Sequence, residues 1–154
     1  KPNSVTDQRL IIEDFYPSIL EMAGITNLKT VQQVDGISFL PLLSGKGNND
    51  KRPLFWHYPN EWGPSGPGIG ATSSTRLGDW KLIYYYKDSS MELFNIKEDI
   101  GETRNLINEQ PAKAWELAKI LSDYLRKVKA QIPARKDTGE QIPYPDEVLN
   151  SYTM

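Results

Sequence analysis

The 154-residue sequence predicts an α+β fold, in which a small antiparallel sheet of about four strands packs against one long C-terminal helix. Two observations lead to this class. Between residues 54 and 96, short runs of large and β-branched residues are separated by Gly, Pro and Asp, which is typical of hairpin-linked strands. An apolar stripe with helical spacing then follows between residues 109 and 129, and a helix of that length can cover one face of such a sheet.

A helical segment is expected before the sheet, over residues 11–23, because apolar residues recur there at helical spacing. Asp14 is the expected N-cap of this helix, and Gly24 the residue that ends it. A shorter apolar stretch over residues 37–43 follows, closed by Ser44 and Gly45.

The expected strands are residues 54–58, 71–77, 80–86 and 91–96. Gly78 and Asp79 form a short turn between the second and third, where glycine supplies a positive φ. The segment from Pro59 to Gly70 holds many Gly and Pro residues, which disfavours both helix and strand pairing. Such a long irregular segment is either disordered or a binding element.

The long helix is expected over residues 109–129, with Pro111 in its first turn, where a missing backbone N–H is tolerated. Its apolar stripe consists of Ala114, Leu117, Ala118, Leu121, Tyr124, Leu125 and Val128. Residues 132–154 contain Pro133, Pro143 and Pro145 without periodicity, so this tail is expected to be extended or poorly ordered.

Composition excludes several classes of function. With 18 Lys and Arg against 20 Asp and Glu, the net charge of −2 provides no basic surface for nucleic acid. No apolar run approaches the roughly 18 residues of a membrane span. The absence of cysteine excludes disulfides, thiolate metal sites and thiol nucleophiles within these residues. A hydrophobic content of 38% is nevertheless enough for a folded core.

Residue chemistry alone assembles no catalytic centre and no metal site. His57 is the single histidine, so a two-histidine zinc site is impossible within the chain. His57 can act as an acid, a base or an anion contact near neutral pH, or it can be a hydrogen-bonded residue at a sheet edge. Neither a Gly-x-Ser-x-Gly turn nor a phosphate-cradling loop ending in Lys-Ser/Thr is present.

Several segments, in order and with fitting spacing, resemble the C-terminal third of the arylsulfatase family within the alkaline-phosphatase-like superfamily. They are residues 14–24 (DFYPSILEMAG), 35–45 (DGISFLPLLSG), 52–59 (RPLFWHYP), 76–83 (RLGDWKLI) and 92–106 (ELFNIKEDIGETRNL). The resemblance covers residues 5–130. It implies that residues 1–50 end a large α/β domain, that 51–131 form a C-terminal subdomain, and that 132–154 are an extended tail.

The resemblance also implies an activity, sulfate-ester hydrolysis, that this chain would not perform alone. In that family a formylglycine acts beside a bound calcium, and both belong to an upstream catalytic domain that would be the partner of this chain. The helix over residues 11–23 would pack on that domain, so its apolar surface is expected to be exposed here. A periplasmic or extracellular location is implied by the same resemblance.

The family resemblance places the His-Tyr-Pro strand and the following loop near the substrate pocket. His57, Asn60, Trp62 and Arg76 are therefore the predicted substrate-facing rim, contacting a sulfated small molecule or glycan. Many relatives have a second histidine where Asn60 stands, but an amide still donates a hydrogen bond to oxygen-rich ligands. Trp62 can stack on a sugar ring or anchor the loop.

Two alternatives remain open at this stage. The chain can be a stand-alone carbohydrate-binding or interaction module, with Trp56, Trp62 and Tyr84 to Tyr86 as its binding surface. It can also be the tail of a related phosphodiesterase or phosphonate hydrolase, although the segments 78–83 and 99–102 favour a sulfatase.

Overall fold

The computed structural model describes residues 1–154 except 1–2, 4, 26, 28, 61–69 and 152–154. The chain forms two compact units, Lys1–Arg52 and Pro53–Met154. The boundary between the units follows Arg52, whereas the sequence-based boundary follows residue 50. No helix among the described residues is long and apolar enough to cross a membrane.

The first unit contains the predicted helical segment, which is a 3₁₀ turn, η1 (Ile12–Asp14), that continues into α1 (Phe15–Met22). Gly24 follows α1 with φ of 78°, a left-handed conformation that glycine adopts without steric cost, so its predicted role in ending the helix is confirmed. The apolar stretch after Asp35 forms only one short helix, α2 (Leu40–Leu43).

Asp14 holds the first unit together, in a different way from the predicted N-cap. Its side chain makes no capping bond to α1, and is fully buried. The carboxylate accepts backbone N–H bonds from Ile11 (3.1 Å) and Ile37 (3.0 Å), and pairs with the guanidinium of Arg52 at 2.8 Å. Three segments that are distant in sequence therefore meet at one carboxylate.

Ser18 and Gly36 add to these contacts, and we call the whole group, with Asp14, Ile37 and Arg52, the Asp14 node. The Ser18 hydroxyl donates to the backbone carbonyl of Asp14 (2.6 Å) and accepts the backbone N–H of Phe39 (2.9 Å). At Gly36, a Cβ would lie 2.0 Å from the carbonyl oxygen of Glu13, so only glycine allows this close backbone approach.

The first unit leaves much of its apolar surface uncovered, as expected for the helical segment. Large side chains of η1 and α1 are between 46% and 77% exposed, namely Ile12, Phe15, Tyr16, Ile19 and Met22. Among the described residues of this unit, Phe39 is the one buried hydrophobic side chain, and its ring lies edge-on to Phe15. Polar contacts thus do more than an apolar core to organise this unit.

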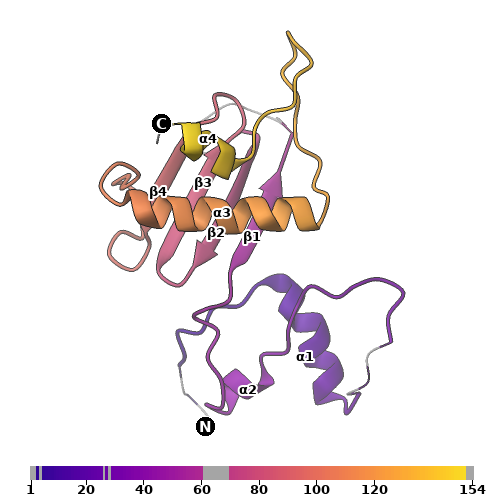
Figure 1. The fold of residues 1–154 in the computed structure, drawn as a ribbon. Helices are drawn as coiled ribbons and strands as arrows, with labels where there is room; N and C mark the ends of the chain where they lie inside the picture. The colour runs from indigo at the N-terminus through magenta and orange to yellow at the C-terminus, as the bar shows by residue number, and fades with distance from the viewer. Residues whose placement is uncertain (1–2, 4, 26, 28, 61–69, 152–154) are drawn as a thin grey trace. The chain divides into compact units, whose positions relative to one another are not determined.

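The second unit confirms the predicted α+β fold. Its antiparallel sheet follows the order β1-β2-β3-β4, formed by β1 (Leu54–Tyr58), β2 (Thr72–Leu77), β3 (Trp80–Tyr85) and β4 (Met91–Asn95). The helix α3 (Pro111–Lys127) lies across one face of this sheet (Figure 1). Gly78, with φ of 59°, begins the two-residue turn between β2 and β3, and the pair Leu77–Trp80 closes it.

The core lies between the sheet and α3. From the sheet, Leu82, Tyr84, Met91 and Leu93 point toward the helix, and from α3 the side chains of Ala114, Leu117, Ala118, Leu121 and Leu125 meet them. These are five of the seven positions of the predicted stripe. Tyr124 stacks instead on Phe55 of β1, and Val128 at the end of the helix is half-exposed.

The predicted extended tail is wrong for its last part, which forms the helix α4 (Pro145–Ser151) against α3. Pro145 begins this helix, where its missing N–H is not needed. The Ser122 hydroxyl of α3 accepts the N–H of Asp146 (3.1 Å), and Arg126 pairs with Asp146 (2.7 Å) and Glu147 (2.9 Å). A helix of two turns is too short to show a periodic apolar pattern, so the sequence did not predict α4.

Leu121 is fully buried in the core between α3 and the sheet, so its side chain should contribute to the free energy of unfolding of the second unit. We expect Leu121→Ala to lower its free energy of unfolding by about 3 kcal/mol, because the lost methyl groups leave a cavity beneath α3. Urea denaturation followed by circular dichroism measures this. Lys119→Ala, on the exposed side of α3, is the control and should change stability by less than about 0.5 kcal/mol. An equal effect of both variants would contradict the assigned core.

The Asp14 node sets local stability in the first unit. Burial alone would raise the pKa of Asp14, but the hydrogen bonds from Arg52, Ile37 and Ile11 outweigh it and hold that pKa below its ordinary value. The contribution of Asp14 to stability is therefore present above its ordinary pKa of about 4, and is lost as pH falls below it.

Replacing this carboxylate tests the node at neutral pH. We expect Asp14→Asn to cost about 2 kcal/mol, because Arg52 loses its partner, and so to accelerate hydrogen exchange of the Ile37 amide roughly 30-fold. Asp50→Asn, in the more exposed pair with Arg9, is the matched control and should change this exchange little. Unchanged exchange in Asp14→Asn would show that the node does not hold the unit together.

Candidate functional site

The candidate site is built around His57, in the edge strand β1. His57 lies opposite Ser73 of β2 in the register, and Phe55, two residues earlier on the same face, stacks on Tyr124 of α3 with ring centroids 3.8 Å apart. Side chains alternate between the two faces of a strand, so His57 faces the side of the sheet that α3 covers. The fully buried side chain of Ser73 agrees with this placement.

Both ring nitrogens of His57 have hydrogen-bond partners. Nδ1 lies 2.7 Å from the Ser73 hydroxyl, which in turn lies 2.7 Å from the hydroxyl of the buried Tyr86. Nε2 lies 3.2 Å from the backbone carbonyl of Gln131, a residue that follows α3. His57 thereby connects the edge strand to the segment after the long helix, an arrangement that agrees with a hydrogen-bonded histidine at a sheet edge.

These partners fix the tautomer of His57. A carbonyl oxygen only accepts, so Nε2 must carry the proton that it donates to Gln131. In the neutral ring Nδ1 is then an acceptor, Ser73 donates to it, and Tyr86 donates to Ser73. Burial lowers the pKa of His57 below its ordinary value, although the Gln131 carbonyl favours the charged form. Burial also raises the pKa of Tyr86, to about 12, so its hydroxyl stays protonated.

The other predicted rim residues are Asn60, Trp62 and Arg76. Asn60 is exposed just beyond the end of β1, and Trp62 lies outside the described residues. Arg76 pairs in the register with Leu54 and is three residues from Ser73 along β2, which places it on the opposite face of the sheet from His57. Its Nε donates to the carbonyl of Gly78 (3.2 Å). The structure therefore separates His57 from Arg76.

Sequence reasoning missed Ser73 and Tyr86 as partners of His57. The signal for Ser73 was available, because pairing strands 54–58 and 71–77 in the observed register sets a polar residue opposite the histidine. Tyr86 belongs to the tyrosine run that the sequence offers as a possible glycan surface, yet Tyr84 and Tyr86 are both buried in the core. Only Tyr85 of that run points to the other face, since neighbouring residues of a strand alternate.

The segment over residues 92–106 has a structural role. The Asp99 carboxylate accepts the backbone N–H groups of Thr103 and Arg104, both at 2.8 Å. The Asn105 side chain accepts the N–H of Leu93 (3.0 Å) in β4 and that of Ile107 (3.0 Å). These contacts fold the loop after β4 and tie it to the sheet, which explains the residue types at these positions.

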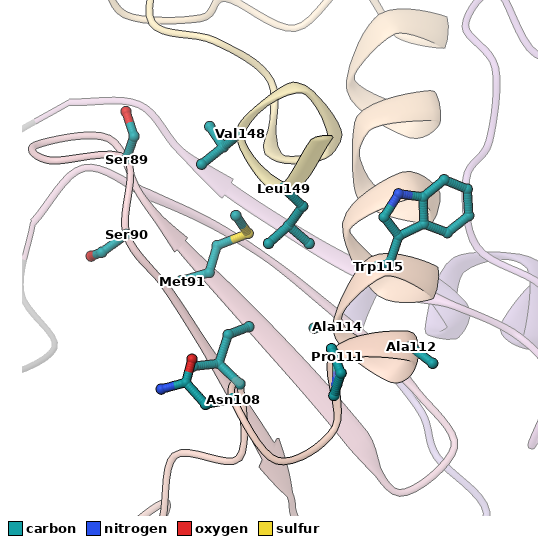
Figure 2. Close-up of a pocket in the computed structure, with 11 residues that line it drawn as sticks. Ser89, Ser90, Met91, Asn108, Pro111, Ala112, Ala114, Trp115, Val148 and Leu149 are labelled. Atoms are coloured by element: carbon teal, nitrogen blue, oxygen red, sulfur yellow. The ribbon is translucent and has the colours of Figure 1, made fainter. Parts of the chain in front are cut away.

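A cavity of about 710 Å³ lies elsewhere in the second unit, between the start of β4, the N-terminal turn of α3 and α4 (Figure 2). Its lining is mostly apolar and includes Met91, Val148 and Leu149, together with the polar Ser89 and Asn108. Among the described residues, no acidic or basic side chain lines it. These residues therefore offer no group for acid–base chemistry and no positive charge to pair with a sulfate.

In the part of the chain that the structure describes, no three His, Asp or Glu side chains come together to hold a metal ion. Hard cations such as calcium require six or more oxygen ligands, several of them carboxylates. The described residues therefore do not fit the calcium site that the family resemblance implies for the catalytic domain.

The protonation of His57 gives a test of the site. We expect the ring to titrate below pH 6.5, with the proton of the neutral form on Nε2, as measured by ¹⁵N NMR. Because the folded-state pKa is lowered, its contribution to stability is present above about pH 6.5 and decreases as pH falls toward the folded-state pKa. A neutral ring protonated on Nδ1, or a pKa above 6.5, would contradict the network.

Comparison with known proteins identifies the fold and the family. The family model described as N-sulphoglucosamine sulphohydrolase, C-terminal, matches residues 1–131. A sulfatase from Formosa agariphila is 34% identical over 155 residues, covering 94% of this chain and 28% of the relative. An arylsulfatase K from Xenopus laevis is 33% identical over 114 residues, covering 70% of this chain and 20% of the relative.

A solved structure agrees with these relatives. A protein in complex with its substrate, D-glucosamine-2-N,6-O-disulfate, superimposes with a TM-score of 0.58 at 26% identity, covering 75% of this chain and 24% of that one. The chain thus spans between a fifth and three tenths of the length of the proteins it matches. It belongs to the sulfatase family represented by the C-terminal domain of N-sulphoglucosamine sulphohydrolase.

Proposed function

We propose that this chain is the C-terminal subdomain of a sulfatase that hydrolyses sulfate esters of a sulfated carbohydrate. It would contribute to the substrate pocket and to stability, while the bond cleavage occurs on an upstream domain of the same polypeptide. The observation that carries the proposal is the family match over residues 1–131 in a chain that spans about a quarter of the matched proteins. The disulfated glucosamine bound by one relative supports a sulfated sugar as substrate.

The first unit supports an upstream domain as partner. Its α1 exposes Tyr16, Ile19 and Met22 by half or more. Large apolar side chains grouped on an exposed helix are typical of a protein interface. We propose that this surface packs on the catalytic domain.

The chemistry would come from that same domain. The described residues offer no metal cluster, and the chain contains neither a cysteine nor a Ser-x-Pro-x-Arg motif from which formylglycine could be made. We therefore propose that calcium and formylglycine are held upstream. A periplasmic or extracellular location belongs to the same proposal.

Within the second unit, we propose that Asn60 contacts the substrate and that His57 positions it. Asn60 is exposed three residues after His57, whose ring is held by Ser73 and Gln131. A fixed β1 end would orient the Asn60 amide toward a sulfate or hydroxyl oxygen. Trp62 remains a proposed sugar-stacking residue. Arg76 lies on the other face of the sheet, so it would have to contact a different part of the substrate from the part that Asn60 contacts.

The contribution of Asn60 can be measured in the parent polypeptide. We expect Asn60→Ala to raise KM for a sulfated disaccharide about tenfold with little change in kcat, because one hydrogen bond to a charged group is lost. Asn108→Ala, at an exposed asparagine that lines the cavity, is the matched control and should leave KM unchanged. Equal KM values in Asn60→Ala and wild type would remove Asn60 from the site.

The proposal that bond cleavage occurs on an upstream domain can be tested with the isolated chain. We expect purified residues 1–154 to show no turnover of 4-nitrophenyl sulfate, because the sequence has neither a cysteine nor a Ser-x-Pro-x-Arg motif to supply formylglycine, and its described residues form no metal cluster. The parent polypeptide assayed in parallel should release nitrophenol. Turnover by the isolated chain that survives repurification would overturn the proposal, and so would an inactive parent with carbohydrate binding by the isolated chain, which would favour the stand-alone module.

A further inference from the structure

The chain between α3 and α4 forms a hairpin that stands out from the second unit (Figure 1). We define the hairpin as residues 132–142. Its two arms pair at Ala134 and Gln141, and Gly139, with φ of 72°, turns the chain at the tip. Residues 134–141 are all exposed, so backbone hydrogen bonds rather than packing hold the tip in shape.

The base of the hairpin is fixed to the core of the second unit. Ile142 is buried and belongs to the apolar cluster between the sheet and α3. The Tyr84 hydroxyl donates to the carbonyl of Pro143, just beyond the hairpin, at 2.7 Å. On the other arm, the ring of His57 donates to the carbonyl of Gln131. The hairpin is therefore an exposed element on a rigid base, an arrangement typical of loops that bind ligands.

The bond to His57 places the hairpin next to the proposed substrate contact. His57 lies three residues before Asn60 at the end of β1, and its partner Gln131 directly precedes the hairpin, which rises beyond the end of β1 (Figure 1). At about 3.3 Å per residue, the arm from Ile132 to Lys136 spans roughly 13 Å, which is longer than one sugar ring. A saccharide that is held at Asn60 and extends beyond the cleaved residue can therefore reach the hairpin.

A lysine at the tip of the hairpin is available to an anionic ligand. Arg135 and Glu140 lie opposite each other, because the Arg135 N–H bonds the Glu140 carbonyl at 2.8 Å, so their opposite charges offset each other. The Asp137 carboxylate accepts the backbone N–H of Thr138 at 3.0 Å, within its own turn. Lys136 is exposed and forms no ion pair with the residues that the structure describes. Its ammonium group can therefore pair with a sulfate or a carboxylate as a point charge.

We propose that the hairpin determines specificity for an acidic oligosaccharide, with Lys136 binding an anionic group of the sugar next to the one that Asn60 contacts. This rests on the proposed function, which supplies the sulfated carbohydrate, and deepens it by requiring a second anionic group. The family match ends at residue 131, directly before the hairpin. The hairpin thus lies outside the stretch that defines the family, where an element that distinguishes one substrate from another is expected.

The test measures steady-state kinetics of the parent polypeptide with two kinds of substrate. Tetrasaccharides from heparin, chondroitin sulfate and carrageenan carry several anionic groups, whereas 4-nitrophenyl sulfate is too small to reach the hairpin. We expect Lys136→Ala to raise KM roughly fivefold for the tetrasaccharide that the parent desulfates fastest, with kcat unchanged, because one exposed ion pair is lost. KM for 4-nitrophenyl sulfate should not change, and high salt should reduce the difference for the tetrasaccharide.

Two further variants are the controls. Lys97→Ala removes an exposed lysine from the turn after β4, at the opposite end of the sheet from Asn60, and should leave every KM unchanged. Lys136→Arg keeps the positive charge and should restore most of the affinity that is lost in Lys136→Ala.

Three outcomes would overturn the proposal. The first is an unchanged tetrasaccharide KM in Lys136→Ala, even with a lower unfolding temperature, because the hairpin would then serve the fold alone. The second is an equal rise of KM for the tetrasaccharide and for 4-nitrophenyl sulfate. The third is a parent that hydrolyses 4-nitrophenyl sulfate and none of the tetrasaccharides. In each case the parent still hydrolyses a sulfate ester, whereas a parent that hydrolyses none would contradict the proposed function and, with it, the role of the hairpin.

Discussion

Burial of the α3 stripe against β3 and β4 is the contact on which the second unit depends. Leu117, Leu121 and Leu125 are fully buried and meet Leu82 and Leu93 from the sheet. An isolated four-stranded meander exposes both faces and would be marginal in water, so the helix supplies the layer that the sheet lacks. The positions of α4, of Gln131 and hence of the His57 ring all follow from where α3 lies.

The predictable part of the fold is the part whose pattern is local. The strands and the Gly78-Asp79 turn follow from alternation and turn chemistry, and α3 follows from a stripe longer than four turns. The helix α4 was missed because Pro145 reads as a breaker unless Ser122 and Arg126 of α3 are known to lie beside it. The predicted N-cap role of Asp14 was wrong for a similar reason. Two partners of its side chain, Ile37 and Arg52, lie 23 and 38 residues away in the sequence.

The candidate site was predictable only in outline. His57 could be singled out as the one titratable group near neutral pH, but its partners depend on register and on the path of the chain after α3. The grouping of His57 with Arg76 depended on which face each side chain takes, and one residue of register decides that. The position of Arg76 close to the Gly78-Asp79 turn does not show which face of the sheet its side chain takes. The sequence resemblance was more informative about the family than about the geometry of the rim.

The sequential strand order of the sheet has a kinetic consequence. Every strand pairs with its neighbour along the chain, and the connections from β2 to β3 and from β3 to β4 are short, so most contacts of the sheet are local in sequence. Folds with such low contact order form quickly, and little time is spent with unpaired strand edges. The hydrogen bond from His57 to Gln131 closes a much longer loop, of 74 residues. That bond would form after α3 docks, as one of the last steps by which the edge strand is secured.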